Sequence, residues 1–179
     1  MRDVLNRALR AAIFDRRTID EAMWERNTTA DAVLLIAGIS ALRVLWSAFT
    51  SSFGVTSLIS SLIRTAISDV AGWLFLAVVT WFIGSRMFTA GESFRRGFEH
   101  SQTMMRAHGI TYLPMVLAVF GGIVAIVGQV WYLAAAAVAT SVALDVKLSQ
   151  GVVSLILGMA GLFLFRTLFS LPFALFSGF

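Results

Sequence analysis

Three charged side chains lie within or beside apolar segments that are long enough to cross a membrane: Arg43, Asp69 and Arg166. Arg43 lies about 20 Å along its segment at 1.5 Å per residue. A charge at such depth is costly, and it indicates either an ion pair between helices or a pathway for a solute. By depth, Asp69 can pair with either arginine, and each arginine can also extend toward the headgroups. We favour an ion pair between helices, or arginine side chains that extend toward the headgroups. A pathway for a solute is the alternative.

The two histidines, His100 and His108, are the next candidates for chemistry. With Glu99 they suggest a metal site, and His108 alone suggests an axial ligand for a porphyrin-like pigment. Their spacing matches no standard site, so we interpret both as solvated loop residues and predict no metal and no cofactor. The chain has no cysteine, which excludes thiolate chemistry. With no G-x-S-x-G, phosphate-loop or H-E-x-x-H motif, we expect no catalytic residue and no enzymatic activity.

Composition places these residues in a membrane protein. The 179 residues are 58% apolar and 13% charged, whereas ordinary globular chains are about 45–50% apolar and about 25% charged. The mean hydropathy is +0.83. The net charge of +4 is not gathered on a solvated face as in a nucleic-acid-binding protein, because the cations separate apolar runs. We therefore expect no nucleic-acid partner.

The apolar runs predict an all-α, polytopic transmembrane bundle of five helices. Residues 1–29 would form a cytoplasmic amphipathic segment, and residues 30–179 would form the transmembrane domain. Only Gln129 separates the third span from the fourth, which predicts a tight antiparallel hairpin there. The residues 89–109 are too polar to cross and are expected to form a loop. The predicted spans are about 30–49, 70–88, 110–128, 130–146 and 151–176.

Amphipathic segments flank the first span. Residues 3–15 place apolar side chains at helical spacing, so we expect a helix that lies in the membrane interface or packs on the protein's own loops. A second short helix would start at Thr18, which has Glu21 at capping-box spacing. Residues 51–68 also predict an interfacial helix. The residues expected at the interface are Arg7, Arg10 and Trp24.

Small residues mark where helices are expected to approach closely. The candidates for helix packing are Gly121, Gly122, Ala125, Gly158 and Gly161.

The distribution of Lys and Arg predicts the orientation. With the N-terminus inside, the inner side carries eleven of the fourteen Lys and Arg residues, and the outer side carries only Arg64. We expect a multi-pass protein with a cytoplasmic N-terminus and an external C-terminus. Heavy use of arginine with a single lysine, Lys147, favours a bacterial inner membrane.

The segment from Gly91 to Pro172 resembles the Yip family of Rab-interacting membrane proteins. The match rests on Gly-Glu-Ser-Phe at residues 91–94, on His-Gly-Ile-Thr-Tyr-Leu-Pro at residues 108–114, and on a turn that contains Trp131. The resemblance, to a bacterial-like member, implies five spans and a cytoplasmic N-terminus. Eukaryotic relatives act in vesicle traffic with Rab partners, and bacterial relatives have no agreed activity.

Together these features predict a non-enzymatic accessory or scaffold subunit that binds other components of a larger membrane complex. One alternative is a small transporter or channel for an anionic solute, with Arg43 and Arg166 attracting the anion. Another is a Yip-like protein that shapes membranes through its amphipathic segments. The expected partners are membrane lipids and other integral membrane proteins, and no small-molecule ligand is predicted.

Overall fold

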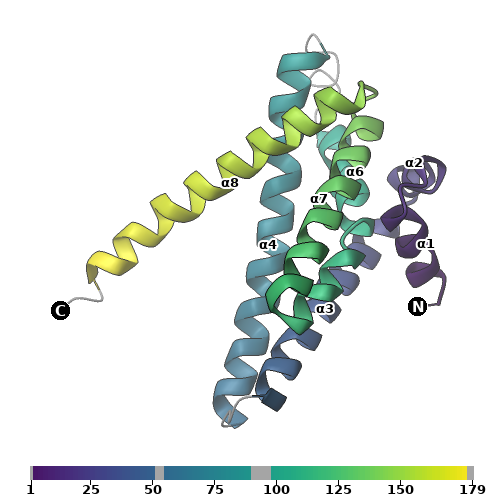
Figure 1. The fold of residues 1–179 in the computed structure, drawn as a ribbon. Helices are drawn as coiled ribbons and strands as arrows, with labels where there is room; N and C mark the ends of the chain where they lie inside the picture. Colours follow the sequence, from purple (N-terminus) through teal and green to yellow (C-terminus); the bar gives the residue numbers. More distant parts are fainter. Residues whose placement is uncertain (1, 51–54, 90–97, 177–179) are drawn as a thin grey trace.

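The computed structural model describes residues 2–50, 55–89 and 98–176, and every regular element in these ranges is a helix (Figure 1). In chain order the elements are α1 (Arg2–Ala12), α2 (Arg16–Trp24), α3 (Thr28–Thr50), α4 (Val55–Phe88), α6 (Phe98–Ile110), the 3-10 helix η1 (Leu113–Phe120), α7 (Gly122–Ala143) and α8 (Leu148–Phe176).

Four of these helices are long and apolar enough to cross a membrane. They are α3, α4 from Thr56, α7, and α8 as far as Phe165. A helix needs about 20 residues to span a bilayer core of about 30 Å, and each of the four has at least 18. The predicted membrane-spanning helices are therefore confirmed for these four elements, and the chain is a multi-pass membrane protein.

Helix α4 corrects the predicted boundary between an interfacial helix and the second span. The structure has one continuous helix of 34 residues from Val55 to Phe88, with no break near Val70. At 1.5 Å per residue it is about 51 Å long, which exceeds the bilayer core. The part predicted as a separate helix is the first half of α4, apart from residues 51–54, which lie outside the described residues.

The predicted hairpin at Gln129 is wrong, because this residue lies inside α7. The chain turns eight residues earlier, at Gly121 and Gly122, whose φ angles are +68° and +53°. These left-handed conformations cost little for glycine and much more for other residues. The predicted third span is replaced by the end of α6, by η1 with Pro114 in its first turn, and by the start of α7.

The predicted polar loop over 89–109 is also partly wrong. Residues 98–110 form α6, which packs against α2, α3, α4 and α7, and residues 90–97 lie outside the described part of the chain. Met104 and Ala107 of α6 are fully buried. A helix with many polar residues is stable here because neighbouring helices cover it on several sides.

The core lies where α3, α4, η1 and α7 meet; α3 packs on α4 and on η1, and α7 packs on the other side of η1 (Figure 1). Ala32 and Ile36 of α3 and Trp73 of α4 pack there with Tyr112 and Tyr132. The two tyrosine rings meet edge to face, with centroids 5.1 Å apart. Aromatic pairs in this geometry stabilise a core beyond the area they bury.

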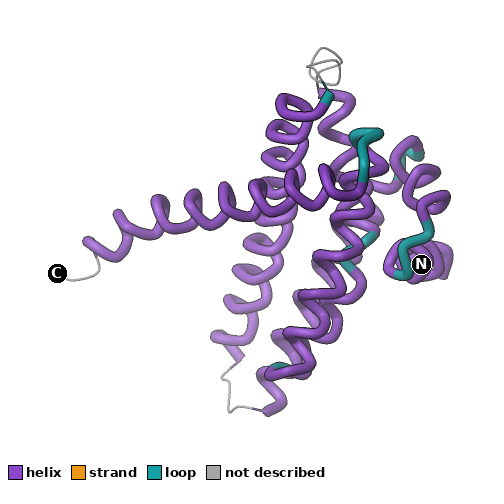
Figure 2. Tube along the Cα trace, turned by 45° about the horizontal axis from the view of Figure 1, so that its top comes forward, coloured by secondary structure: helices purple, strands orange, loops and turns teal. Residues whose placement is uncertain are grey.

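Helix α8 starts in the bundle and then leaves it. Figures 1 and 2 both show its C-terminal half extending away from the other helices. Near its start α8 packs on α4 and α7, and Phe165 stacks on Phe75 of α4 with ring centroids 4.3 Å apart. The rest of α8 therefore projects from the bundle toward the surrounding membrane.

The N-terminal helices pack on the side of the bundle. Helix α1 contacts α2, α6, α7 and η1, and the indole Nε1 of Trp131 in α7 donates to the carbonyl of Ala12 at 2.7 Å. Helix α2 is capped by Asp15, which accepts from the backbone amides of Arg17 and Thr18. The helix thus begins two residues before the predicted start at Thr18, whose hydroxyl donates to Asp15 at 2.7 Å.

Candidate functional site

An ion pair joins α3 to α4 in the interior of the bundle. Arg43 Nη2 donates to Asp69 Oδ2 at 2.7 Å, and the hydroxyl of Ser40 donates to the same oxygen at 2.6 Å. Ser40 and Arg43 are three residues apart, so they share one face of α3. The Asp69 side chain is only 16% exposed and that of Arg43 is 35% exposed. Partial removal from solvent strengthens their attraction relative to a surface pair.

The pair forms one wall of a cavity of about 350 Å³, which we call the ion-pair cavity. Its other walls come from α4, α7, α8 and the residues around the start of η1. They include four residues whose side chains carry an indole, two phenols and an amide: Trp73, Tyr112, Tyr132 and Gln129. This volume is within the range of about 300–1,000 Å³ that is typical of small-molecule sites.

The cavity offers hydrogen-bonding groups in an otherwise apolar environment. Arg43 and Asp69 cancel each other's formal charge, so the cavity is close to neutral. Trp73 is 2% exposed, and its indole N–H has no acceptor among the described residues. No group of three His, Asp or Glu that could hold a metal ion occurs in the described ranges. The arrangement is suited to binding a polar group of a membrane-soluble molecule.

The structure brings together two of the three predicted intramembrane charges. Arg43 and Asp69 pair directly, and Arg166 lies on α8, where its side chain is outside the described residues. Sequence reasoning missed Ser40, the third member of the ion-pair cluster, and the other residues that line the cavity. A signal was present for Ser40, whose spacing from Arg43 places both on one helix face, but Tyr112 and Gln129 come from distant parts of the chain.

Two of the predicted packing glycines lie at a helix contact. A Cβ on Gly158 would overlap the Oγ1 of Thr80, and a Cβ on Gly161 would lie 3.0 Å from a methyl group of Val79. Both positions let α8 approach α4.

The other two glycines have a different role from the predicted one. A Cβ at Gly121 or Gly122 would meet nothing within 4 Å, so these residues form the turn before α7 and make no close packing contact. Ala125 lies in the first turns of α7 and is partly buried. Two adjacent glycines are common both in tight turns and at close helix contacts, so the sequence alone did not distinguish these two roles.

Two further glycines, Gly109 and Gly151, also lie at close helix contacts. A Cβ on Gly109 would overlap Ala32 of α3, and a Cβ on Gly151 would come within 2.8 Å of the Ala137 carbonyl in α7. These residues allow α6 and α8 to approach their neighbours.

The residues predicted at the interface have three different environments. Arg7 pairs with Glu25 and, at 3.3 Å, with Asp31 at the start of α3. Arg10 is exposed, and Trp24 is 67% exposed. Arg7 therefore connects α1 to the start of α3, while the other two side chains are free to contact lipid or water.

His108 is not the solvated loop residue that was predicted, because it is fully buried. Its Nε2 lies 2.8 Å from the hydroxyl of Thr140, which donates to the Ala136 carbonyl. The hydroxyl has one hydrogen, so Nε2 carries the proton and donates to Thr140. The Nδ1 atom has no partner in the described part of the chain. His108 thus links α6 to α7, and His100 lies near the start of α6, partly exposed.

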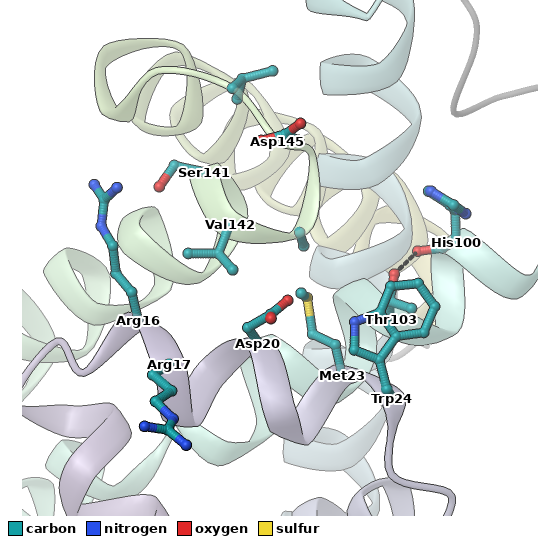
Figure 3. Close-up of a pocket in the computed structure, with 12 residues that line it drawn as sticks. Arg16, Arg17, Asp20, Met23, Trp24, His100, Thr103, Ser141, Val142 and Asp145 are labelled. Carbon is teal, nitrogen blue, oxygen red and sulfur yellow. Dashed lines mark hydrogen bonds between the residues drawn. The ribbon is translucent and has the colours of Figure 1, made fainter.

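A second, more polar pocket of about 610 Å³ lies between α2, α6 and the turn from α7 to α8. Figure 3 shows the carboxylates of Asp20 and Asp145 facing this space, with Arg16 beside Ser141. Thr103 donates to the His100 carbonyl at 2.8 Å at its edge. Its charges of both signs suit a solvated crevice at the end of the bundle.

Comparison with known proteins identifies no relative of this chain, because no family model, no curated protein and no solved structure matches it.

Proposed function

We propose that this protein is a non-enzymatic accessory subunit that binds other integral membrane proteins through α8. The observation that carries the proposal is that α8 leaves the bundle (Figures 1 and 2). Its exposed apolar side chains include Ile156, Phe163 and Leu164, which are 58%, 71% and 60% exposed. Helices associate in a bilayer by close packing of complementary shapes, and a projecting helix offers a partner two sides on which to pack.

Site-specific photocrosslinking in the native membrane tests this proposal. A photoreactive residue at Phe163 is expected to give a discrete adduct with a second protein. Leu34 of α3 is a matched control, because it is similarly exposed at 67% but lies on the bundle, and it should give lipid adducts only. Equal adducts at the two positions, or a lone monomer after purification in mild detergent, would contradict the proposal.

The anion-transport alternative is less well supported by the site. Arg43 is paired with Asp69, so its charge is neutralised where a transported anion would need a free cation. Reconstituted flux that is lost in Arg43→Ala would restore this alternative.

Contact of α1 with lipid is favoured by a specific observation. Helix α1 turns Ala8 and Ala11 toward the bundle and leaves Leu5 and Leu9 exposed at 46% and 55%. Ile13, which directly follows the helix, is 65% exposed. An exposed apolar row on a helix that also carries Arg10 suits the membrane interface. In this proposal the membrane-shaping role, which is the alternative drawn from the Yip-like resemblance, rests on α1. Leu9→Ser should weaken liposome binding by the isolated α1 peptide, and Asn6→Ser should not.

We further propose a cytoplasmic N-terminus in a bacterial inner membrane, supported by the distribution of Lys and Arg. Because the chain lacks cysteine, single cysteines can be placed at the two ends of α7. An impermeant thiol reagent added outside intact cells should label Ile123→Cys, which is highly exposed in the fold, and should spare Lys147→Cys. The reverse pattern would invert the topology.

A further inference from the structure

The lining of the ion-pair cavity includes residues whose side chains can form hydrogen bonds. Trp73 is buried, lines the cavity, and has an indole N–H without an acceptor in the described part of the chain. The Nε1 atom is itself covered by neighbouring atoms, so a ligand oxygen would reach this unpaired donor only after the indole ring shifts. The neighbouring amide of Gln129 supplies a further hydrogen-bonding group.

An apolar groove adjoins this cavity. The groove has a volume of about 540 Å³ and lies between α4 and α8, with Phe75, Val78 and Phe165 among its walls. Gly72 and Leu162 line both the groove and the cavity. The partition between them thus includes one residue without a side chain, and the groove faces the region where α8 diverges from the bundle.

We propose that the ion-pair cavity and the groove between α4 and α8 together bind a single-chain amphiphile taken from the bilayer. Its uncharged head, which bears hydrogen-bond acceptors, would lie in the ion-pair cavity, and its chain would lie in the groove. The groove is lined by Leu162 and Phe165 of α8, whereas the protein-binding surface proposed above consists of exposed side chains of the same helix, such as Phe163.

The charges and the location favour this class of ligand. Because Arg43 is already paired with Asp69, a charged head would have to compete with one member of the pair. Arg43 lies seven residues before the end of α3, which places it about 10 Å from that end. A weakly hydrated head, such as an ester with hydroxyl groups, tolerates this depth better than a phosphate does.

Quenching of tryptophan fluorescence tests the proposal directly. The chain has five tryptophans, and a variant that keeps only Trp73 is placed in nanodiscs of zwitterionic phosphatidylcholine. The probe is a monoacylglycerol with a brominated chain. Quenching of Trp73 is expected to saturate. The control variant keeps only Trp46, which is 42% exposed on α3. Its quenching should rise in proportion to the probe concentration and should not saturate. The same unsaturated rise in both proteins would overturn the proposal.

Matched glycine substitutions test whether the cavity itself is the site. Gly72→Leu fills the partition and is expected to weaken binding about tenfold or more. Gly38→Leu is the control, because Gly38 is exposed and a Cβ there would meet nothing within 4 Å, and its affinity should equal that of the parent. Equal affinity in Gly72→Leu would place the probe elsewhere and refute the site.

Two further measurements fix the ligand class. A brominated fatty acid that binds about tenfold more tightly than the monoacylglycerol would show an anion site and refute an uncharged head. Gln129→Leu should weaken binding of the monoacylglycerol but not binding of a brominated alkane.

If the variant with one tryptophan does not fold, native mass spectrometry of the unaltered protein provides a second test. The unaltered protein should retain the monoacylglycerol, and Gly72→Leu should lose it. Failure to retain it would refute the proposal while leaving the crosslinking test of α8 unaffected.

Discussion

Thr80 of α4 occupies the space that a side chain at residue 158 of α8 would need. The two helices can approach this closely because Gly158 presents only backbone to the threonine. The α4–α8 contact continues beyond it to Phe165, which stacks on Phe75, so Gly158 belongs to the part of α8 that stays packed on the bundle.

Gly158→Ala is predicted to destabilise the protein by about 1–3 kcal/mol, because its added methyl group overpacks the α4–α8 contact. Thr80→Ala removes the overlapping Oγ1 atom, so the double variant should recover much of this loss. Equilibrium unfolding in detergent measures the effect. Gly38→Ala is the control, since its Cβ meets nothing within 4 Å. A loss as large in the control would mean that the contact is not responsible.

Removing one member of the Arg43–Asp69 pair is predicted to lower the unfolding free energy much more than replacing both members with apolar residues. Arg43→Met or Asp69→Leu alone leaves one charge without its partner and should reduce the unfolding free energy by about 3 kcal/mol. The double variant replaces both charges with apolar side chains and should lose much less. A double-mutant cycle measures the coupling. Additive losses would show that the two side chains do not stabilise each other.

The turn before α7 can be tested by substitutions at two positions. Gly121→Ala should cost about 1–2 kcal/mol, because alanine resists the left-handed conformation. Gln129→Pro lies in the interior of α7 and should cost about 3 kcal/mol or more. Thermal unfolding of both variants measures these losses. If the chain instead turned at Gln129, the proline would be tolerated and Gly121→Ala would be neutral or stabilising.

The cap of α2 is predicted to weaken in acid. The hydrogen bond from the Thr18 side chain, together with the backbone amides, lowers the pKa of Asp15 below its ordinary value of 3.8. Because the folded pKa is depressed, the contribution to stability is complete above pH 3.8 and is lost as the pH falls through the lower folded value. Hydrogen exchange of the Arg17 and Thr18 amides, corrected for intrinsic rates, should accelerate in that window.

Asp15→Asn is the matched control for this pH dependence, because asparagine also caps helices but does not titrate. The α2 amides of this variant should exchange at corrected rates that do not change with pH. The same acid sensitivity in the parent protein and in the Asp15→Asn variant would assign the effect to another group.

The sequence was sufficient to predict the helices that consist of one uninterrupted apolar run. The first span was predicted at 30–49 and α3 extends from Thr28 to Thr50, because Thr28 and Asp31 mark a clear start before the apolar residues. The last span was predicted from residue 151, and α8 begins at Leu148. In both cases one local signal determines the structure.

The errors arose where tertiary contacts decide the outcome. Residues 98–110 are polar enough for a loop, but burial of His108 against Thr140 satisfies one of its ring nitrogens inside the bundle. Gln129 reads as a turn residue in an apolar run, yet it lies in a helix and its amide lines the ion-pair cavity. The cavity could not be predicted from sequence, because five elements far apart in the chain contribute its walls.

The hydrogen bond from Trp131 to the carbonyl of Ala12 gives the protein an intrinsic reporter of its own N-terminus. When α1 detaches, this indole loses its acceptor and its fluorescence environment changes. Docking and release of the first twelve residues can therefore be followed by tryptophan fluorescence, without an added dye.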